Sequence, residues 1–423
     1  MAEHIEIPLS RPTHPLLFAV MVLPFSAAVG FLQVAVPYSL RSQGVSLAAI
    51  AALSGTAFYP MALKILWVPL IDLAPRRRRW YVASALTTAF LLAGCVLVPD
   101  PSQHLVLFTL LLTGAEAAAA TMAASLYALM ATTTRVTDKG KAGGYYMAGN
   151  VGGTGILGAL PIWLTGHHFS PTQAGSALVG ICVLAMLPIF WVQEVHAPRE
   201  ARDGSWLRAA QGKMGSIGRD VWSIASSREG LTGLLICGLP IGCGALTNLF
   251  SGMAPDYHAS EHTVELVTGL IGGLVGAAGS IVGGQLADRV NRRLVYVTAG
   301  CLTGLCAVGM ALSPMNAHTY TWGALAYSFC NGIAFAAFAG LVLEMVSHGA
   351  AVATKYNLFV AVSNQAIAYT TFLDGRASLF RHGGTVGTVW FDAILTFTGA
   401  GLLGLILLVS RGKRCRFIAE AAR

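Results

Sequence analysis

The sequence predicts an all-α membrane protein with twelve transmembrane helices, and three observations lead to this fold class. Hydrophobic residues make up 55% of the 423 residues, charged residues only 11%, and the mean hydropathy is +0.64. Soluble domains carry about 25% charged residues, so the side chains needed to cover a water-exposed surface are missing. The apolar residues also form long runs instead of the short alternating segments of a transmembrane β-barrel. These runs are long enough for the roughly 20 residues of helix that cross a bilayer.

Twelve such runs follow one another along the chain. We expect helices at 15–41, 46–73, 80–99, 104–134, 142–166, 174–195, 231–255, 263–286, 294–314, 318–347, 354–378 and 385–410. The first run is too long for the core of a signal peptide and lacks a basic segment before it, so we expect it to be retained. An even number of spans places both termini on the same side of the membrane.

The distribution of basic residues predicts which side that is. Of the 27 Lys and Arg, 23 lie in the two termini and the loops on one side, including the linker 196–230. The other side has only Arg41, Arg376 and Arg381, and Lys64 lies inside a span. Because loops rich in Lys and Arg stay in the cytoplasm, we expect both termini there, in a bacterial-type inner membrane. The same bias explains the net charge of +8 without a nucleic-acid partner.

The two halves of the chain carry matching landmarks at one constant spacing of 216 residues. The matched pairs are Pro24 and Pro240, Asp72 and Asp288, Arg76 and Arg292, and Lys139 and Lys355. A constant offset indicates an internal repeat. We therefore expect two pseudo-symmetric six-helix bundles at 1–195 and 231–423. The polar segment 196–230 would join them as a cytoplasmic linker, either an amphipathic helix on the membrane surface or a flexible tether.

Two loops resemble the signatures of known transporters. The sequence from Gly284 to Arg293 resembles G-x-x-x-D-R-x-x-R-R, the loop signature of major facilitator transporters. The stretch from Lys64 to Asp72 reads K-x-x-W-x-P-x-x-D and looks like the version in AmpG-type muropeptide permeases and acetyl-CoA transporters. The residues 353–356 are also similar to that group. Bacterial siderophore permeases share much of this pattern, so the resemblance does not fix the substrate.

The resemblance implies the major facilitator fold and secondary active transport by alternating access. We expect a monomeric permease that carries a small, anionic or amphiphilic metabolite, driven as a symporter by H+ and without a cofactor. The alternatives are a siderophore or drug permease of the same fold, or a membrane receptor or scaffold that transports nothing. An enzyme is not expected, because the sequence has no Walker A, H-E-x-x-H or G-x-S-x-G motif. No metal site is expected from the scattered His and Cys residues.

Two ionisable residues are predicted deep in the membrane, where burial costs several kcal/mol and favours a function. Lys64 lies about 12 Å from the cytoplasmic end of the second span, and Glu116 about 18 Å into the fourth, at 1.5 Å per residue. Both depths are near the bilayer centre. The two side chains could neutralise each other. Alternatively, Lys64 could bind an anionic substrate while Glu116 carries a proton.

Polar side chains in other spans complete the candidate pathway. These are Gln33, Asn150, Asn248, Asn331, Asn364, Gln365 and Tyr369. Such a set would suit a substrate with several hydrogen-bonding groups, although buried amides also commonly hold helices together at about 1 kcal/mol each. We expect Glu344 and Asp374, close to helix ends, to be solvated at the interface. The position of Asp392 in the last span leaves its role open.

The loop signatures also predict a conformational latch at the cytoplasmic helix ends. Its candidate residues are Asp72, Arg76 and Arg77 in the first half and Asp288, Arg289 and Arg292 in the second. A carboxylate at such a position can pair with an arginine on the next turn or cap a helix N-terminus. A pair that holds one conformation and opens in the other would serve a rocking mechanism. The alternative is that these residues only determine topology and cap helices.

Overall fold

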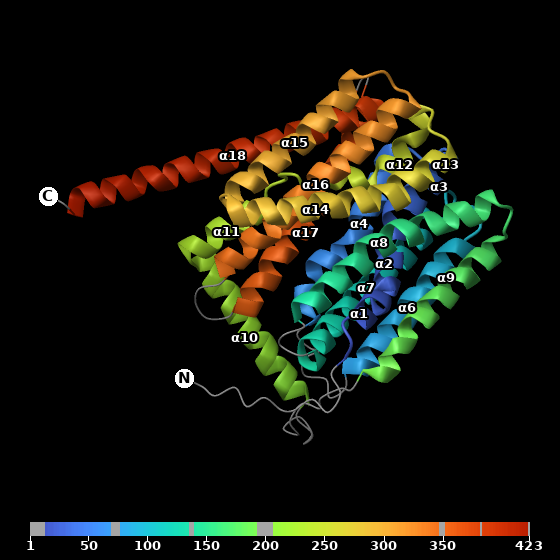
Figure 1. Cartoon of the computed structure of the whole chain (residues 1–423), viewed down its shortest axis with the longest axis horizontal. Coiled ribbons are helices and arrows are strands. Elements are labelled where there is room, and N and C mark those ends of the chain that lie inside the picture. The colour runs from blue at the N-terminus through green and yellow to red at the C-terminus, as the bar shows by residue number, and fades with distance from the viewer. Residues whose placement is uncertain are drawn as a thin grey trace. The chain divides into compact units, whose positions relative to one another are not determined.

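The computed structural model describes residues 13–68, 77–134, 139–192, 206–346, 352–380 and 383–421, and the regular secondary structure in these ranges is helical (Figure 1). Nine helices in this part of the chain are long and apolar enough to cross a membrane. The prediction of an all-α membrane protein is therefore confirmed.

The first half of the chain forms helices at each of its six predicted spans. They are α1 (Leu16–Met21), α2 (Leu23–Gly30), η1 (Phe31–Ala35), α3 (Val36–Ser42), α4 (Leu47–Leu63), η2 (Lys64–Leu66), α6 (Arg77–Leu97), α7 (Leu105–Thr133), α8 (Lys139–Gly166), α9 (Pro171–Met186) and η4 (Leu187–Trp191). The first span is thus one helical rod with a π-helical turn, η1, in its middle. The linker contains the helix α10 (Trp206–Ser226).

The second half also forms helices at all six predicted spans, with one break. Its elements are α11 (Arg228–Gly238), η6 (Ala245–Asn248), α12 (Phe250–Met253), η7 (Ala254–Tyr257), α13 (Glu261–Val264), η8 (Glu265–Leu270), α14 (Ile271–Arg289), α15 (Arg292–Leu312), α16 (Ala317–Val346), α17 (Val352–Ala377) and α18 (Gly384–Ala421). The seventh span, expected as one helix over 231–255, is interrupted at 239–244. Pro240 lacks the amide hydrogen that a helix needs, and Gly242 and Gly244 adopt positive φ angles of 55° and 75°.

Contacts divide the chain into two compact units. Unit 1 comprises residues 1–35 and 63–218, and unit 2 comprises residues 36–62 and 219–423. Unit 2 therefore contains a segment of the first repeat, from Val36 to Ala62. The bundle boundaries predicted at 195 and 231 remain a prediction.

Glycines let helices touch closely inside unit 1. A Cβ atom at Gly158 of α8 would lie 2.6 Å from the carbonyl oxygen of Gly30 of α2, closer than any real Cβ contact. Elsewhere in unit 1, the buried hydroxyl of Tyr81 on α6 donates to the carbonyl oxygen of Met21 at 2.8 Å. Close backbone approach through small residues is a common way to pack helices in lipid.

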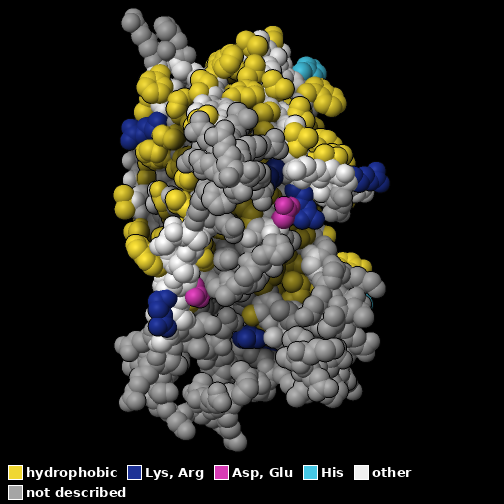
Figure 2. Space-filling view, turned by 90° about the vertical axis from the view of Figure 1, so that its left-hand side faces the viewer, with side chains coloured by type: hydrophobic (Ala, Val, Ile, Leu, Met, Phe, Trp, Pro, Cys, Tyr) yellow, Lys and Arg dark blue, Asp and Glu magenta, His cyan; other side chains and the backbone are white. Residues whose placement is uncertain are grey.

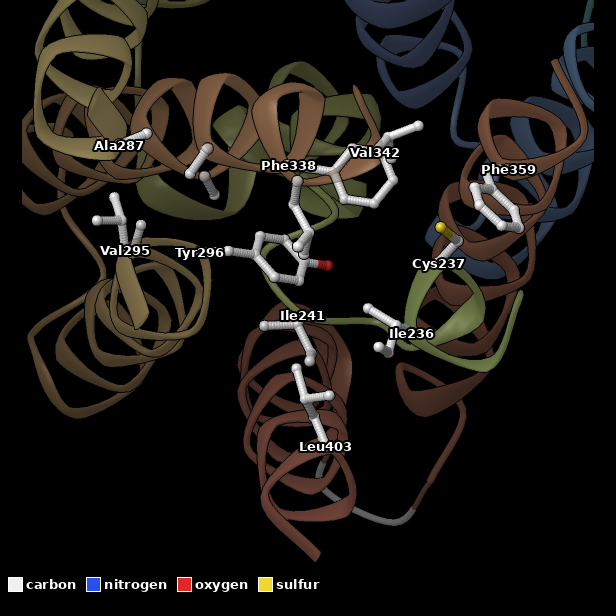
Figure 3. Close-up of a cluster of buried hydrophobic side chains, with 14 of the residues drawn as sticks. Ile236, Cys237, Ile241, Ala287, Val295, Tyr296, Phe338, Val342, Phe359 and Leu403 are labelled. Carbon is white, nitrogen blue, oxygen red and sulfur yellow. The ribbon is translucent and has the colours of Figure 1, made fainter. Parts of the chain in front are cut away.

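Unit 2 packs around the broken seventh span. The buried side chains of Ile236, Ile241, Tyr296, Phe338 and Leu403 meet there, with the Tyr296 ring between Ile241 and Phe338 (Figure 3). The helices α14 and α16 lie side by side (Figure 1). A Cβ atom at Gly283 of α14 would lie 2.6 Å from the Ile333 carbonyl oxygen of α16.

Many large apolar side chains stay exposed on the outward faces of the helices. Figure 2 shows such side chains gathered on one face of the molecule. Val106 is 77% exposed, Leu110 66% and Ile281 65%. These helices can span a bilayer, so we expect their exposed apolar side chains to contact lipid.

Candidate functional site

Glu116 is the most deeply buried charged residue that the sequence predicted. It lies in the middle of α7, has no exposed surface, and neither carboxylate oxygen accepts a hydrogen bond within the described ranges. The thiol of Cys95 on α6 lies nearby. An ionised carboxylate without partners would cost several kcal/mol in such surroundings, so the neutral acid is the form that fits.

Lys64 does not neutralise Glu116. It is half-buried in the short turn η2, and the described part of the chain shows no ion pair between the two side chains. The mutual pairing considered from the sequence is therefore not formed. Three residues later, the indole nitrogen of Trp67 donates to the Thr121 hydroxyl of α7 at 3.0 Å. That bond fixes the end of the second span against α7 within unit 1.

The other two predicted pathway residues of unit 1 are both half-buried. Gln33 lies in the π-helical turn η1, a kind of helix distortion that is frequent at functional sites. Asn150 lies on α8, whose glycine-rich face packs against the first span. The two amides lie on helices that are in contact with each other.

In unit 2, predicted pathway residues surround the break in the seventh span. The Asn331 amide donates to the Gly242 carbonyl oxygen at 2.9 Å, and the Tyr369 hydroxyl donates to the Gly238 carbonyl oxygen at 2.7 Å. Carbonyls released by a broken helix need donors in a bilayer, because no water is available there. These two side chains therefore stabilise the interrupted backbone.

The remaining predicted amides link α17 to neighbouring segments. The Asn248 amide donates to the Thr371 hydroxyl at 2.9 Å, and the Asn364 amide donates to the Met61 carbonyl oxygen at 3.0 Å. Gln365 is half-buried on α17. In this conformation Asn248, Asn331, Asn364 and Tyr369 all serve as ties between helical segments, which is the alternative role that the sequence had left open.

A small recess of about 10 Å³, roughly the space of one water molecule, lies beside the broken segment of unit 2. Its walls include Cys237, Cys243, Tyr296, Phe335, Phe338 and Ser363. The lining is mostly apolar, with a few groups that can form hydrogen bonds. In transporters built from repeats, broken helices commonly carry the substrate and ion sites.

The sequence was wrong about Asp374, which it placed at a solvated helix end. The Asp374 side chain has no exposed surface. Asp392 of α18 and Thr388, one turn before it, are also completely buried. Asp374 and Asp392 lie within hydrogen-bonding reach of each other. The buried hydroxyl of Tyr327 on α16 donates to the Asp392 carboxyl at 3.3 Å. Neither aspartate has an ion pair with a basic side chain in the ranges that the structure describes.

An ion pair in unit 2 was not predicted, because its partners lie far apart in the sequence. Arg41, at the end of α3, binds both carboxylate oxygens of Asp256 in η7, at 2.8 and 2.9 Å. The Thr385 hydroxyl at the start of α18 also donates to Asp256. Both charged side chains are about one quarter exposed. Arg41 and Asp256 occupy almost equivalent positions in the two repeats, because adding the spacing of 216 to Arg41 gives Tyr257, the residue next to Asp256. A comparison of the two repeats could therefore have suggested this pair.

The predicted cytoplasmic latch is described only in part. Asp72 and Arg76 lie outside the described residues, as does the side chain of Asp288. Arg77 is half-buried at the start of α6, and Arg289 is exposed at the end of α14. Arg292 pairs with Glu344 of α16 at 3.6 Å, so α15 and α16 are joined at that end. The latch itself remains a prediction.

Three solved structures share this architecture. A D-xylose–proton symporter has a TM-score of 0.69 at 12% identity, covering 92% of this chain and 95% of that chain. The xylose transporter XylE from E. coli has a TM-score of 0.66 at 12% identity, covering 92% and 94%. The nucleoside transporter NupG has a TM-score of 0.66 at 12% identity, covering 93% and 98%. Similarity at this level of identity shows a common fold.

Comparison with curated proteins finds no match. The family comparison, by contrast, matches the Major Facilitator Superfamily over residues 16–368, which is most of the chain. Together with the nine membrane-length helices of the described residues, this match shows that the chain belongs to the Major Facilitator Superfamily and is a membrane transporter, not an enzyme.

Proposed function

We propose that this transporter couples the movement of a small, anionic or amphiphilic metabolite to the proton gradient. The observation that carries the proposal is Glu116, a fully buried carboxyl without a hydrogen-bond partner in the described part of the chain. Such a group is neutral while buried and can ionise only when water reaches it. A carboxyl that changes its access to water during a transport cycle can carry a proton. One structural neighbour is itself described as a proton symporter.

The proposed substrate class rests on the cation at Lys64. Its ammonium group has no ion pair among the residues that the structure describes, so it is available to an anion. The K-x-x-W-x-P-x-x-D stretch that contains it resembles AmpG-type permeases, which supports a muropeptide-like or acyl-CoA-like compound.

We further propose alternating access between two membrane faces, with both termini in the cytoplasm of an inner membrane. The residues 36–62 of the first repeat are held within unit 2 by the Arg41–Asp256 ion pair and by the bond from Asn364 to Met61. Both contacts join segments from different repeats. A charged pair at the helix ends can act as a gate that is closed in this conformation and opens in the other.

A binding screen followed by flux measurements tests the proposal. The purified protein is heated with candidate metabolites, since a ligand that binds the folded state raises Tm. The candidates are muropeptides, acyl-CoA compounds, siderophores, drugs, D-xylose and nucleosides. Uptake of each compound that raises Tm is then measured in proteoliposomes with and without an imposed pH gradient. We expect an anionic or amphiphilic hit whose uptake is accelerated by the gradient.

Two results of this screen would contradict the proposal. A ligand that raises Tm but never crosses the membrane under any gradient would indicate a receptor. Uptake confined to D-xylose or nucleosides would show that the proposed anionic substrate class is wrong. Uptake of a siderophore or a drug would identify the alternative permease functions.

A further inference from the structure

Unit 2 hides two carboxyl groups next to each other, and their contact requires a proton. Asp374 and Asp392 lie within hydrogen-bonding reach, and both are completely buried. Two ionised carboxylates have only acceptor atoms, so they repel each other and cannot form a hydrogen bond. A buried pair of this kind holds together when one member is protonated and donates to the other.

The hydrogen-bond partners show which member is the donor. Asp392 accepts a hydrogen bond from the Tyr327 hydroxyl at 3.3 Å. Neither oxygen of Asp374 accepts a bond from a donor in the ranges that the structure describes. Asp374 is therefore satisfied only by donating its own proton to Asp392. Asp392 then accepts from two donors, an arrangement that stabilises a carboxylate.

The surroundings of the pair contain other polar groups but no neutralising cation. Tyr327 of α16 and Cys243 of the interrupted segment both lie close to the two carboxyls. Tyr296 of α15 and Tyr369 of α17 lie close to Cys243 in turn. Within the described ranges, neither aspartate has a Lys, Arg or His partner. Among the described residues no basic side chain supplies a positive charge, so a bound proton is the simplest way to neutralise the pair.

A third buried oxygen lies on the same helix as Asp374. Thr370 lies one helical turn before Asp374 on α17, is 1% exposed, and is within reach of the Cys243 thiol. Residues four apart lie on the same helix face. Cys243 belongs both to this cluster and to the lining of the small recess beside the broken seventh span. The carboxyl pair therefore lies close to that recess.

We propose that Asp374 and Asp392 form a proton-binding site in unit 2, separate from Glu116 in unit 1. In the present conformation Asp374 holds one proton and donates it to Asp392. Asp392 takes up a second proton from water when the recess opens, and releases it on the other side of the membrane. This inference deepens the proposed function, since it assigns a second residue pair to the same coupling ion.

Infrared spectroscopy of the full-length protein in lipid membranes tests this site. Protonated carboxyls absorb separately from carboxylates, and the spectra are recorded in D2O from pD 5 to 10. We compare the wild type with the double variant Asp374→Asn/Asp392→Asn and with Glu116→Gln. The control Glu261→Gln removes a half-exposed carboxyl at the start of α13. Asn retains the size and much of the hydrogen bonding of Asp, so we expect the double variant to fold.

We expect the double variant to lose a protonated-carboxyl band that remains in Glu116→Gln and in Glu261→Gln. If the double variant does not purify as a folded protein, Asp374→Asn alone is expected to lose that band. A variant spectrum identical to the wild type at every pD would overturn the proposal. Disappearance of the wild-type band on addition of Na+ at constant pD would also overturn it, in favour of a sodium site. These spectra require no substrate, so a failure to find transport would refute the proposed function without affecting this result.

Discussion

The two units bury their acidic residues in different ways. Unit 1 hides the single carboxyl of Glu116, whereas unit 2 hides the adjacent carboxyls of Asp374 and Asp392. At the repeat spacing of 216, Glu116 corresponds to Gly332, and Asp374 corresponds to Gly158. Both glycines lie where two helices touch so closely that a side chain would collide with backbone. The two halves therefore share their helices, but the positions equivalent to Glu116 and Asp374 are close helix contacts, and the position equivalent to Asp392 is the exposed Ser176.

This comparison explains why the positions equivalent to Glu116 and Asp374 in the other half cannot hold acidic side chains. A carboxyl at Gly158 would meet the backbone of Gly30, and a carboxyl at Gly332 would meet the backbone of Gly276. The lone acid and the acid pair are consequently distinct groups with different partners. Four predictions test the difference, beginning with the largest expected effect.

Replacing Glu116 with Gln should abolish uptake driven by a pH gradient. For a one-to-one symporter, each unit of pH gradient supports about tenfold accumulation, or about 1.4 kcal/mol. The amide cannot release a proton, so this accumulation should fall to the level found without a gradient. Exchange of labelled for unlabelled metabolite, which needs no net proton movement, should persist. If the variant accumulates as much metabolite as the wild type, Glu116 is not the proton carrier. A purely structural role for Glu116 predicts this result.

Adding one methyl group at Gly158 should destabilise unit 1 by about 2 kcal/mol, because overpacking against backbone cannot be relieved by a side-chain rotation. The measurement is thermal unfolding of Gly158→Ala in detergent. Gly152→Ala on the same helix is the matched control, because a Cβ atom there meets nothing within 4 Å. The control should be neutral or slightly stabilising, since Ala is favoured over Gly in helices. Equal Tm changes in the two variants would contradict the close contact between α2 and α8.

Removing the hydroxyl of Tyr327 should destabilise unit 2 by about 1.5 kcal/mol, the lower end of the range for a hydrogen bond to a charged group, because 3.3 Å is long for such a bond. Asp392 would lose one of its two donors. Tyr257→Phe serves as the control, because the Tyr257 hydroxyl is also buried but has no partner in the described structure. Thermal unfolding of the two variants should therefore differ. If Tyr327→Phe were as stable as the control, Asp392 would not be the acceptor described above.

Breaking the Arg41–Asp256 pair should have the smallest effect on stability, about 1 kcal/mol, since both side chains are partly exposed to water. The effect is measured in a double-mutant cycle of Arg41→Ala and Asp256→Ala. Exchanging the two charges, Arg41→Asp with Asp256→Arg, should restore part of the loss in both stability and uptake rate. If each single variant and the exchanged pair transport at the wild-type rate, the pair is not a gate.

The helices could be predicted from the sequence because a bilayer permits few alternatives. Runs of apolar residues longer than a membrane is thick must form helices, and all twelve predicted runs contain helix in the structure. The break in the seventh span was not predicted, although its cause is visible in the sequence. Pro240 and Gly244 interrupt the helix, whereas Pro24 at the equivalent position lies near the N-terminus of α2, where a missing amide hydrogen costs little.

The site was predicted less completely, because burial depends on contacts between distant segments. Glu116 could be found from its depth in one apolar helix. Asp374 could not, since the packing of α17 against other segments of unit 2, such as α18 and α16, removes it from water. Its distance from the helix end suggested solvation instead. The partners Arg41 and Asp256 are separated by 215 positions, and comparison of the two repeats is the one sequence signal that could have joined them.

Proton movement accompanying the metabolite is the most direct test of the central claim that this chain is a proton-coupled transporter. Proteoliposomes are loaded with a pH-sensitive dye, and the metabolite identified by the thermal screen is added outside at equal internal and external pH. The account predicts that the lumen of wild-type vesicles acidifies as the metabolite enters, and that Glu116→Gln vesicles show no such change. Entry of the metabolite into wild-type vesicles at constant internal pH would contradict it.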